Sequence, residues 1–340
     1  MKYRYFVTVL ILLFAISSFY CSKKDKSSSS DNKDNKDLVR KSGDNIFVTL
    51  KMKPKTGDVH SYKMVISQNA SQQSEYTNNK EVSSRQDMEY YYSMKVAEVN
   101  DDGVIAYKVN YDSIKVNYSE DNPQNPIALA YNSNVKDSVY KMQEFMTYNA
   151  MIGNEFKIRV SALGEIKEVI EMDKIESRIA KEFGDTLKPE EKTQIMDALK
   201  TQLKEVIQSQ FQIFSNKELA KDSSWTFTQQ STIGSFPIAN IVTYKITDIQ
   251  QKDDITKVNI AASLDFKVLE NNIKDKQMTM SLENENGTGS GTVVFNLSNG
   301  TVEKKQYEKS LSSTIKMSAK GQSATAKRKD SIVYTLDLLN

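Results

Sequence analysis

The sequence MEYYYSMKVAEVNDDGVIAYKVNYDSIKVNY, residues 88–118, alternates apolar and polar side chains on both sides of the segment NDDG at 100–103. Alternation with a period of two is typical of a strand with one buried face. Because Asn, Asp and Gly favour tight turns, the two runs predict an antiparallel hairpin. The apolar positions change from odd to even numbers near Asp112 and Ser113, which predicts a β-bulge that bends the second strand.

The same alternation recurs along most of the chain. It covers residues 46–52, 62–66, 242–246, 258–268, 293–297, 311–317 and 332–338. Asn299-Gly300, between two of these runs, predicts a hairpin with a two-residue turn. We therefore expect about a dozen antiparallel strands, each with one face in water. Because so many strands rarely stay flat, the predicted fold class is α+β, with a large curved antiparallel β-sheet or an open barrel-like sheet.

A helical insertion is expected in the middle of the sheet, at about residues 172–215. Ile175 and Ile179 are four residues apart there, and Pro189 precedes two acidic residues suited to the first turn of a long helix. The broad apolar face of that helix fits a helical pair packed on the sheet, a lid over an apolar cavity, or a surface for a partner. Another helix is expected from about Ser133 onward.

The N-terminus has the composition of an export signal. Lys2 and Arg4 precede the apolar run VTVLILLFAI at 7–16, and Cys21, the only cysteine of the chain, follows. The run is shorter than the roughly 20 residues that a membrane-spanning helix needs. The segment resembles the signal of bacterial lipoproteins, which is cleaved before a cysteine that becomes diacylated. This resemblance implies a signal peptide at 1–20 and lipid attachment at Cys21, which anchors the protein to the membrane.

The residues after the cysteine are rich in Ser, Lys, Asp and Asn, which predicts a disordered tether at 21–43 followed by one folded domain at 44–340. Ser22, by resemblance to lipoprotein sorting rules, favours the bacterial outer membrane, where the domain would lie on the periplasmic or surface side. Two alternatives stay open for the signal: cleavage near Ser17 or Ser18, or retention as an uncleaved anchor.

Charge and residue counts argue against several functions. The formal net charge is +2; the signal carries two positive charges and the tether a surplus of three, which leaves the folded domain near −3. No basic excess is therefore available for nucleic acid. A single cysteine excludes an intramolecular disulfide, and a single histidine, His60, excludes a His-rich metal site. We expect His60 on the surface.

We assign no catalytic residue, cofactor-binding residue or metal ligand. The chain has no nucleophile-elbow motif, Walker loop or dinucleotide fingerprint. The glycines of NGTGSG at 286–291 are interpreted as a turn and a bulge. Asp101-Asp102 and Asp253-Asp254 are adjacent acids in predicted turns, where Asp is favoured for local hydrogen bonds. We therefore do not expect an enzyme.

Three short motifs resemble an uncharacterised family of bacterial envelope proteins, a domain of unknown function usually found behind a lipoprotein signal. The resemblance covers about residues 45–340. The motifs are IGNEFKI at 152–158 with SALGEIKEV at 161–169, DSSW at 222–225, and SNGTV at 298–302. In the second motif, relatives tend to have a glycine and an aspartate before the serine and tryptophan. These are turn and packing signatures, and the resemblance implies no known activity.

Two functions therefore remain as hypotheses. A curved sheet with helices over it, and many Met, Tyr and Phe residues, favours a binding module for an apolar small molecule. The alternative is a structural or assembly protein that contacts another envelope protein through sheet edges or the long helix. The methionines also suit a plain hydrophobic core.

Overall fold

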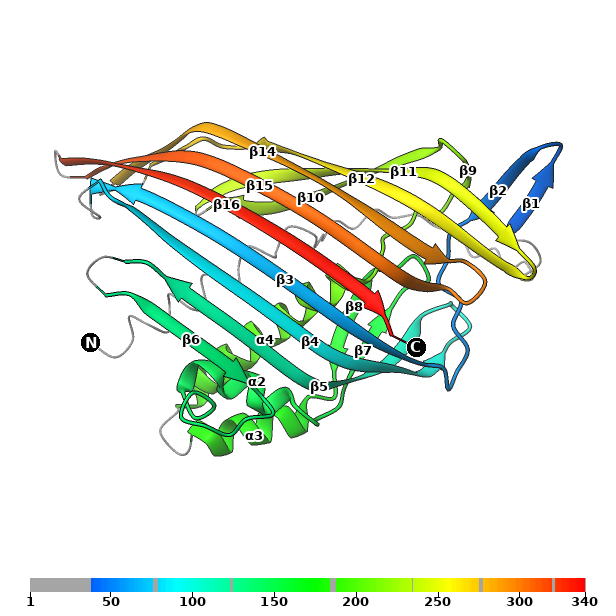
Figure 1. The fold of residues 1–340 in the computed structure, drawn as a ribbon, viewed down its shortest axis with the longest axis horizontal. Coiled ribbons are helices and arrows are strands. Elements are labelled where there is room, and N and C mark those ends of the chain that lie inside the picture. Colours follow the sequence, from blue (N-terminus) through cyan, green and yellow to red (C-terminus); the bar gives the residue numbers. More distant parts are fainter. Residues whose placement is uncertain are drawn as a thin grey trace.

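The computed structural model describes residues 38–75, 79–122, 125–183, 188–233, 235–274, 278–319 and 322–339. A curved sheet of 13 strands forms most of the molecule (Figure 1). In spatial order its main strands are β10 (Ser224–Ile233), β11 (Phe236–Lys252), β12 (Ile255–Val268), β14 (Met278–Asn296), β15 (Thr301–Ala319), β16 (Gln322–Leu338), β3 (Val59–Ser74), β4 (Glu81–Val99), β5 (Ile105–Glu120), β7 (Phe156–Val160) and β8 (Ile166–Ile170). The short strands β13 (Asn272–Lys274) and β6 (Ile127–Asn132) pair with β14 and β5.

Strands that follow each other in sequence pair along most of this sheet, except that β12 pairs with β14 past β13, β5 pairs with β7 past β6, and one junction is long-range. The last strand, β16, lies antiparallel to β3, and this pairing joins the C-terminal half of the sheet to the N-terminal half (Figure 1). The sheet ends at β10 on one side and β8 on the other, and no described strand bridges these two edges. The predicted fold class, a large curved antiparallel sheet with a helical insertion, is confirmed, and the sheet is open.

The hairpin predicted at residues 88–118 is confirmed. β4 and β5 pair around the turn at 100–103, and the register shifts opposite Asp112, where the bulge was expected. The turn at Asn299-Gly300 is also present, but its loop has four residues, because Asn296 is the register partner of Thr301. The loop is longer than predicted because the backbone N–H of Leu297 bonds to β12 instead of closing the hairpin.

The described chain begins with a small second sheet. It consists of β1 (Val39–Ser42), β2 (Asn45–Thr49) and β9 (Glu218–Ala220). The tether predicted at 21–43 is therefore too long at its C-terminal end, because Val39 pairs with Val48 and Leu38 packs against the core. The rest of the tether and the signal peptide lie outside the described residues.

The helices lie beside β4, β5 and β6 (Figure 1). Among the described residues, these helices are the 3-10 turn η3 (Gln143–Phe145), α2 (Met146–Met151), α3 (Asp173–Phe183) and α4 (Pro189–Gln210). No described helix has the length and apolar character needed to cross a membrane. The prediction of a helix from Ser133 onward is wrong for the first part of that segment, where the chain forms turns. Side chains hold these turns, since Asp137 accepts from the Tyr140 N–H and Asn149 donates to the Tyr140 carbonyl.

We call the sheet face that packs against α4 the inner face. The apolar residues of α4, including Leu199 and Leu203, are buried and line a narrow gap with Tyr90 of β4 and Tyr111 of β5. The helix thus packs on the sheet, which is the first of the three alternatives given for its apolar face. Its C-terminal end reaches the middle of the inner face, where the candidate site lies.

Candidate functional site

The inner face of β14 carries glycine at three successive positions, Gly287, Gly289 and Gly291. A Cβ atom on Gly291 would lie 2.0 Å from the ring of Tyr307, and one on Gly287 would lie 2.2 Å from the ring of Phe266. The two rings therefore lie directly over the backbone of β14. The glycines thus allow side chains of the neighbouring strands to approach the backbone of β14 closely.

This placement corrects our interpretation of the stretch 286–291 as a turn and a bulge. The glycines lie inside one continuous strand that pairs with β12 and β15. The nearby irregularity is in the pairing with β15, between Glu283 and Asn286. Glycine is required here by the close approach of aromatic rings, and not by a change of chain direction.

A pocket opens on the inner face beside these glycines. It contains about 650 Å³ of space between atoms, part of which is open to solvent, and the space wide enough for the centre of a water molecule is about 40 Å³. It is therefore a narrow slot. Most of its lining atoms are apolar, and come from residues such as Ile66, Val242, Leu264, Tyr307, Ile332 and Tyr334. Ser209, at the end of α4, borders it as well.

A lysine lies at the end of this pocket nearest to α4. Lys305 is only 5% exposed, and its Nζ donates to the carbonyl of Phe211 at 2.7 Å. The ammonium also lies 5.0 Å from the ring centroid of Tyr307. Burial lowers the pKa of Lys305 to about 7, because the charged form loses its hydration. The carbonyl belongs to the C-terminal end of α4, where the helix dipole favours a cation.

A second lysine lines the same pocket four residues further along β15. Lys309 is half-buried, and burial lowers its pKa to about 8, against the opposing effect of the charge of Asp330. Asp330 itself accepts two hydrogen bonds from Arg328, at 2.7 and 2.8 Å. The pocket therefore combines apolar walls with two inward-facing ammonium groups.

Polar side chains fix the end of α4 against the sheet. The hydroxyl of Tyr92 donates to Oε1 of Gln210 at 2.6 Å. The hydroxyl of Tyr307 donates to Oε1 of Gln212 at 3.1 Å. Both glutamines are buried, so these bonds hold the residues that border the pocket in one position.

The first family motif lies against the same helix end. Gln208 accepts from the N–H of Ile166 at 2.8 Å and donates to the carbonyl of Gly164 at 2.9 Å. Gly164 has φ +86°, and a Cβ atom there would lie 2.0 Å from the Gln212 carbonyl oxygen. Glycine is therefore required at this turn both by backbone conformation and by close packing.

The second motif contacts the chain just after α4. The indole N–H of Trp225 donates to the carbonyl of Ile213 at 3.2 Å, and its ring stacks on Tyr244 at 5.3 Å. Asp222, at the position where relatives tend to have glycine, has φ +69°. This left-handed conformation suits glycine best and is tolerated by Asp.

The third motif forms the turn between β14 and β15. Gly300 has φ +69°, and a Cβ atom there would lie 2.0 Å from the backbone nitrogen of Lys53. On the strand before this turn, the ring of Phe295 packs against Phe214 with centroids 4.5 Å apart. All three motifs therefore contact, or lie beside, the segment 211–214 that follows α4.

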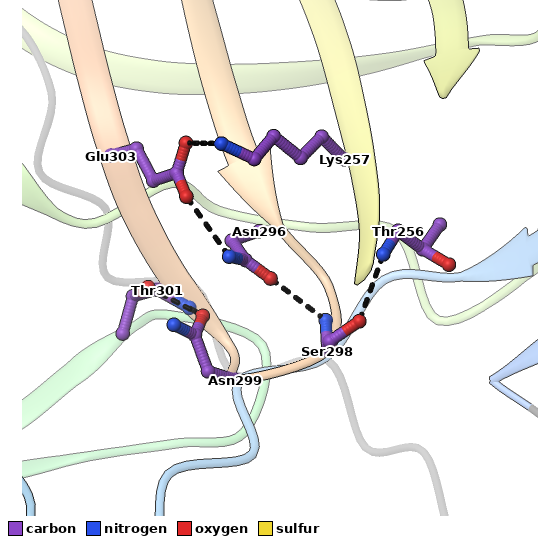
Figure 2. Close-up of polar contacts among 7 residues, drawn as sticks. All are labelled: Thr256, Lys257, Asn296, Ser298, Asn299, Thr301 and Glu303. Carbon is purple, nitrogen blue, oxygen red and sulfur yellow. Dashed lines mark hydrogen bonds and ion pairs between the residues drawn. The ribbon is translucent and has the colours of Figure 1, made fainter. Parts of the chain in front are cut away.

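Figure 2 shows the polar contacts that brace the same turn. Glu303 accepts from Lys257 at 2.7 Å and from the amide of Asn296 at 2.9 Å. Asn296 in turn accepts from the backbone N–H of Ser298, whose hydroxyl accepts from the N–H of Thr256 at 2.9 Å. These bonds tie β12, β14 and β15 together and contain no group arranged for chemistry.

The structure places the residues singled out from sequence as follows. Cys21 lies outside the described residues. The pairs Asp101-Asp102 and Asp253-Asp254 lie in exposed turns, away from the pocket. His60 is not a surface residue, because it is half-buried and its Nε2 atom has no hydrogen-bond partner in the described part of the chain. Burial lowers its pKa.

Sequence reasoning missed Lys305 and Lys309. A signal was present, because both lysines share odd numbering with Tyr307 and Leu311 on the strand KQYEKSL at 305–311. On an alternating strand, shared parity places them on the same face as the apolar residues.

Residues 102–302 match the family model DUF6263, described as a family of unknown function. This match covers more than half of the chain, and the chain belongs to that family. The predicted membership of a family of unknown function is thereby confirmed. All three motifs fall within the matched residues.

No curated protein matches this chain. Among solved structures, lipovitellin, from a study of its lipid–protein interactions, gives a TM-score of 0.42 at 11% identity; the alignment covers 85% of this chain and 26% of that chain. The translocator domain of the autotransporter NalP from Neisseria meningitidis gives 0.21 at 6% identity, with 82% and 88% of the chains covered. OpdQ of Pseudomonas aeruginosa gives 0.20 at 6% identity, covering 83% and 100%. TM-scores this low establish no shared function.

Proposed function

We propose that this protein is a binding module for an apolar ligand, which it holds in the inner-face pocket. The observation that carries the proposal is the slot itself, which stays unfilled beside Gly289, Tyr307 and Lys305 on a sheet face that is packed elsewhere. An unfilled space in a core loses packing contacts. The walls of this slot are apolar. Ligand pockets have this character, with few polar groups among apolar lining atoms.

We further propose that the domain works at the bacterial outer membrane, tethered by a lipid on Cys21. The order of charged start, apolar run, cysteine and polar segment supports this proposal. Two acyl chains give stable anchoring where one does not. We propose no enzymatic activity, since the pocket lacks paired carboxylates among its described lining residues.

The proposed binding is tested by native mass spectrometry of the full chain, purified in a nonionic detergent. We expect a bound small molecule that organic solvent releases. Gly289→Val would narrow the slot, because its Cβ would lie 2.9 Å from the carbonyl oxygen of Glu308 and 3.1 Å from the Cβ of Leu264, so the walls must shift to admit it. Thr292→Val is the matched control, since Thr292 lies on the same strand and is exposed. The proposal fails if the folded wild-type protein carries no molecule, or if the folded Gly289→Val protein keeps it at full occupancy.

The alternative, an assembly role, is supported by the edge of the sheet. β10 has ten residues and pairs on one side with β11, and no described strand lies on its other side. An extended segment of another protein can add to such an edge by backbone hydrogen bonds. Crosslinking in intact cells from a photoreactive residue at an exposed β10 position, such as Thr228, separates the two functions. A specific protein adduct there, without a bound small molecule, would favour assembly.

A further inference from the structure

The two lysines of the pocket extend the proposed function, on which the following inference rests. Lys305 lies among apolar groups, and its contacts among the described residues are the Phe211 carbonyl and the Tyr307 ring. No described carboxylate lies within ion-pair distance of it. A buried ammonium without a counter-ion is costly, and proteins usually pair such a charge.

Lys305 differs from the other charged groups near the pocket in having no acid beside it. Asp330 is the acid whose charge acts on Lys309, and Arg328 donates two hydrogen bonds to it. Glu308, which also lines the pocket, is exposed and accepts from the hydroxyl of Ser290. An anion in the pocket would supply the counter-ion of Lys305.

Polar groups continue from the pocket across the neighbouring strands. Ile332, which lines the pocket, is the register partner of Gln68, and Gln68 is the partner of Gln86 on β4. Gln68 is 1% exposed, and neither its amide nitrogen nor its amide oxygen has a hydrogen-bond partner in the described part of the chain. Buried amides in native proteins are nearly always hydrogen-bonded, so this position suits the polar end of a ligand.

We propose that the ligand is an anionic amphiphile whose acyl chain lies in the apolar slot and whose carboxylate or phosphate group is bound by Lys305 and Lys309. The slot suits an acyl chain because it is narrow and its walls are apolar. Lysine recognises a carboxylate or phosphate as a point charge, and the apolar surroundings strengthen the pairing. Gln68, next to Ile332, supplies further hydrogen bonds to the headgroup.

The test uses the full chain in a nonionic detergent and three photoreactive probes that have the same hydrocarbon chain length. They are diazirine-labelled palmitic acid, the corresponding alcohol, and the corresponding lysophosphatidic acid. Crosslinked peptides are identified by mass spectrometry. We expect the two anionic probes to label β12, β14 and β16. Their labelling should be roughly 10- to 100-fold more efficient than that of the alcohol, because a hydrogen bond to a charged group contributes that much affinity. The stronger of the two anionic probes identifies the headgroup as carboxylate or phosphate.

Variants separate the headgroup from the slot. Lys305→Met and Lys309→Met should each reduce labelling by the anionic probes toward the level of labelling by the alcohol. Lys304→Met is the matched control, because Lys304 is adjacent and exposed. Lys309 is half-buried, so its variant keeps the test informative if Lys305→Met fails to fold.

Three outcomes overturn this inference, and they are distinguishable. If the alcohol labels the inner face as efficiently as the acids, apolar binding stands and the anionic headgroup is wrong. If no probe labels the inner face, the apolar-ligand function itself is wrong. Equal loss of anionic labelling in Lys304→Met would also refute the assignment, because it would indicate a general surface charge effect.

Discussion

The buried ammonium of Lys305 predicts how the stability of this protein changes with pH. Burial lowers its pKa from an ordinary value of 10.5 to about 7. Between these values the unfolded chain holds a proton that the folded chain has released, so the free energy of unfolding rises with pH. One proton corresponds to about 1.36 kcal/mol per pH unit. The gain from Lys305 is therefore roughly 2.7 kcal/mol between about pH 7.5 and 9.5.

Lys305→Met removes this titrating group. The free energy of unfolding of the variant should therefore rise less steeply with pH, by the slope that corresponds to about one proton. Lys309, whose pKa is about 8, and Lys204, whose pKa is also lowered by burial, continue to contribute in the variant. Glu205 and Tyr244 are buried groups that act outside this window. The pKa of Glu205 is raised to about 6, and that of Tyr244 is raised to about 12. Tyr244 opposes the trend only when tyrosines of the unfolded chain begin to ionise, near pH 10.

The slope is measured by urea denaturation of the full chain in a nonionic detergent, at half-unit steps across this pH range. Trp225, the only tryptophan, reports unfolding by fluorescence because it is packed on Tyr244 in the folded state. Lys304→Met is the control and should keep the wild-type slope. Equal slopes for wild type and Lys305→Met would refute the claim that Lys305 is desolvated. A bound anionic amphiphile should flatten the wild-type slope, because it restores the ordinary pKa of the lysine.

Three further predictions concern packing and anchoring. Gly164→Ala should lower the free energy of unfolding by about 3 kcal/mol or more, because the new Cβ meets a backbone carbonyl. Gly153→Ala is the control: it is also at positive φ but in open space, so it should lower the free energy of unfolding by only about 1 kcal/mol. Equal urea midpoints for the two variants would contradict this prediction. Trp225→Phe removes an indole hydrogen bond and should cost about 1 kcal/mol, measured by circular dichroism in urea. Cys21→Ser should abolish incorporation of labelled palmitate in growing cells, and retained label would refute lipidation at that residue.

The sheet could be predicted from sequence because its strands alternate in a regular way. The β4–β5 hairpin and its bulge followed directly from the parity change at Asp112. The segment after Ser133 could not be predicted in the same way, because apolar spacing there is produced by aromatic packing. Tyr131 stacks on Phe145 with ring centroids 4.5 Å apart, and side-chain bonds to the backbone replace the helix.

The pocket was harder to predict, because it depends on which strands become neighbours. The glycines at 286–291 suggest a turn when they are considered alone. They indicate close packing only once β15 brings Tyr307 onto β14, and β12 brings Phe266. The pairing of β16 with β3 likewise joins residues that are more than 200 positions apart, such as Ile332 and Gln68. No local pattern contains that information.

Two features that break the rules of core packing lie at or beside the pocket. Lys305 on β15 is buried, and the buried amide of Gln68 on β3 has no hydrogen-bond partner among the described residues; β16 lies between these two strands. Each of them costs stability compared with an apolar side chain of fitting size. Many other inner-face positions carry Met, Tyr, Val and Ile, which are packed and buried. A sheet selected only for stability would have no reason to bury a lysine beside an apolar slot, whereas a site that must admit an acyl chain and hold its charged end requires one.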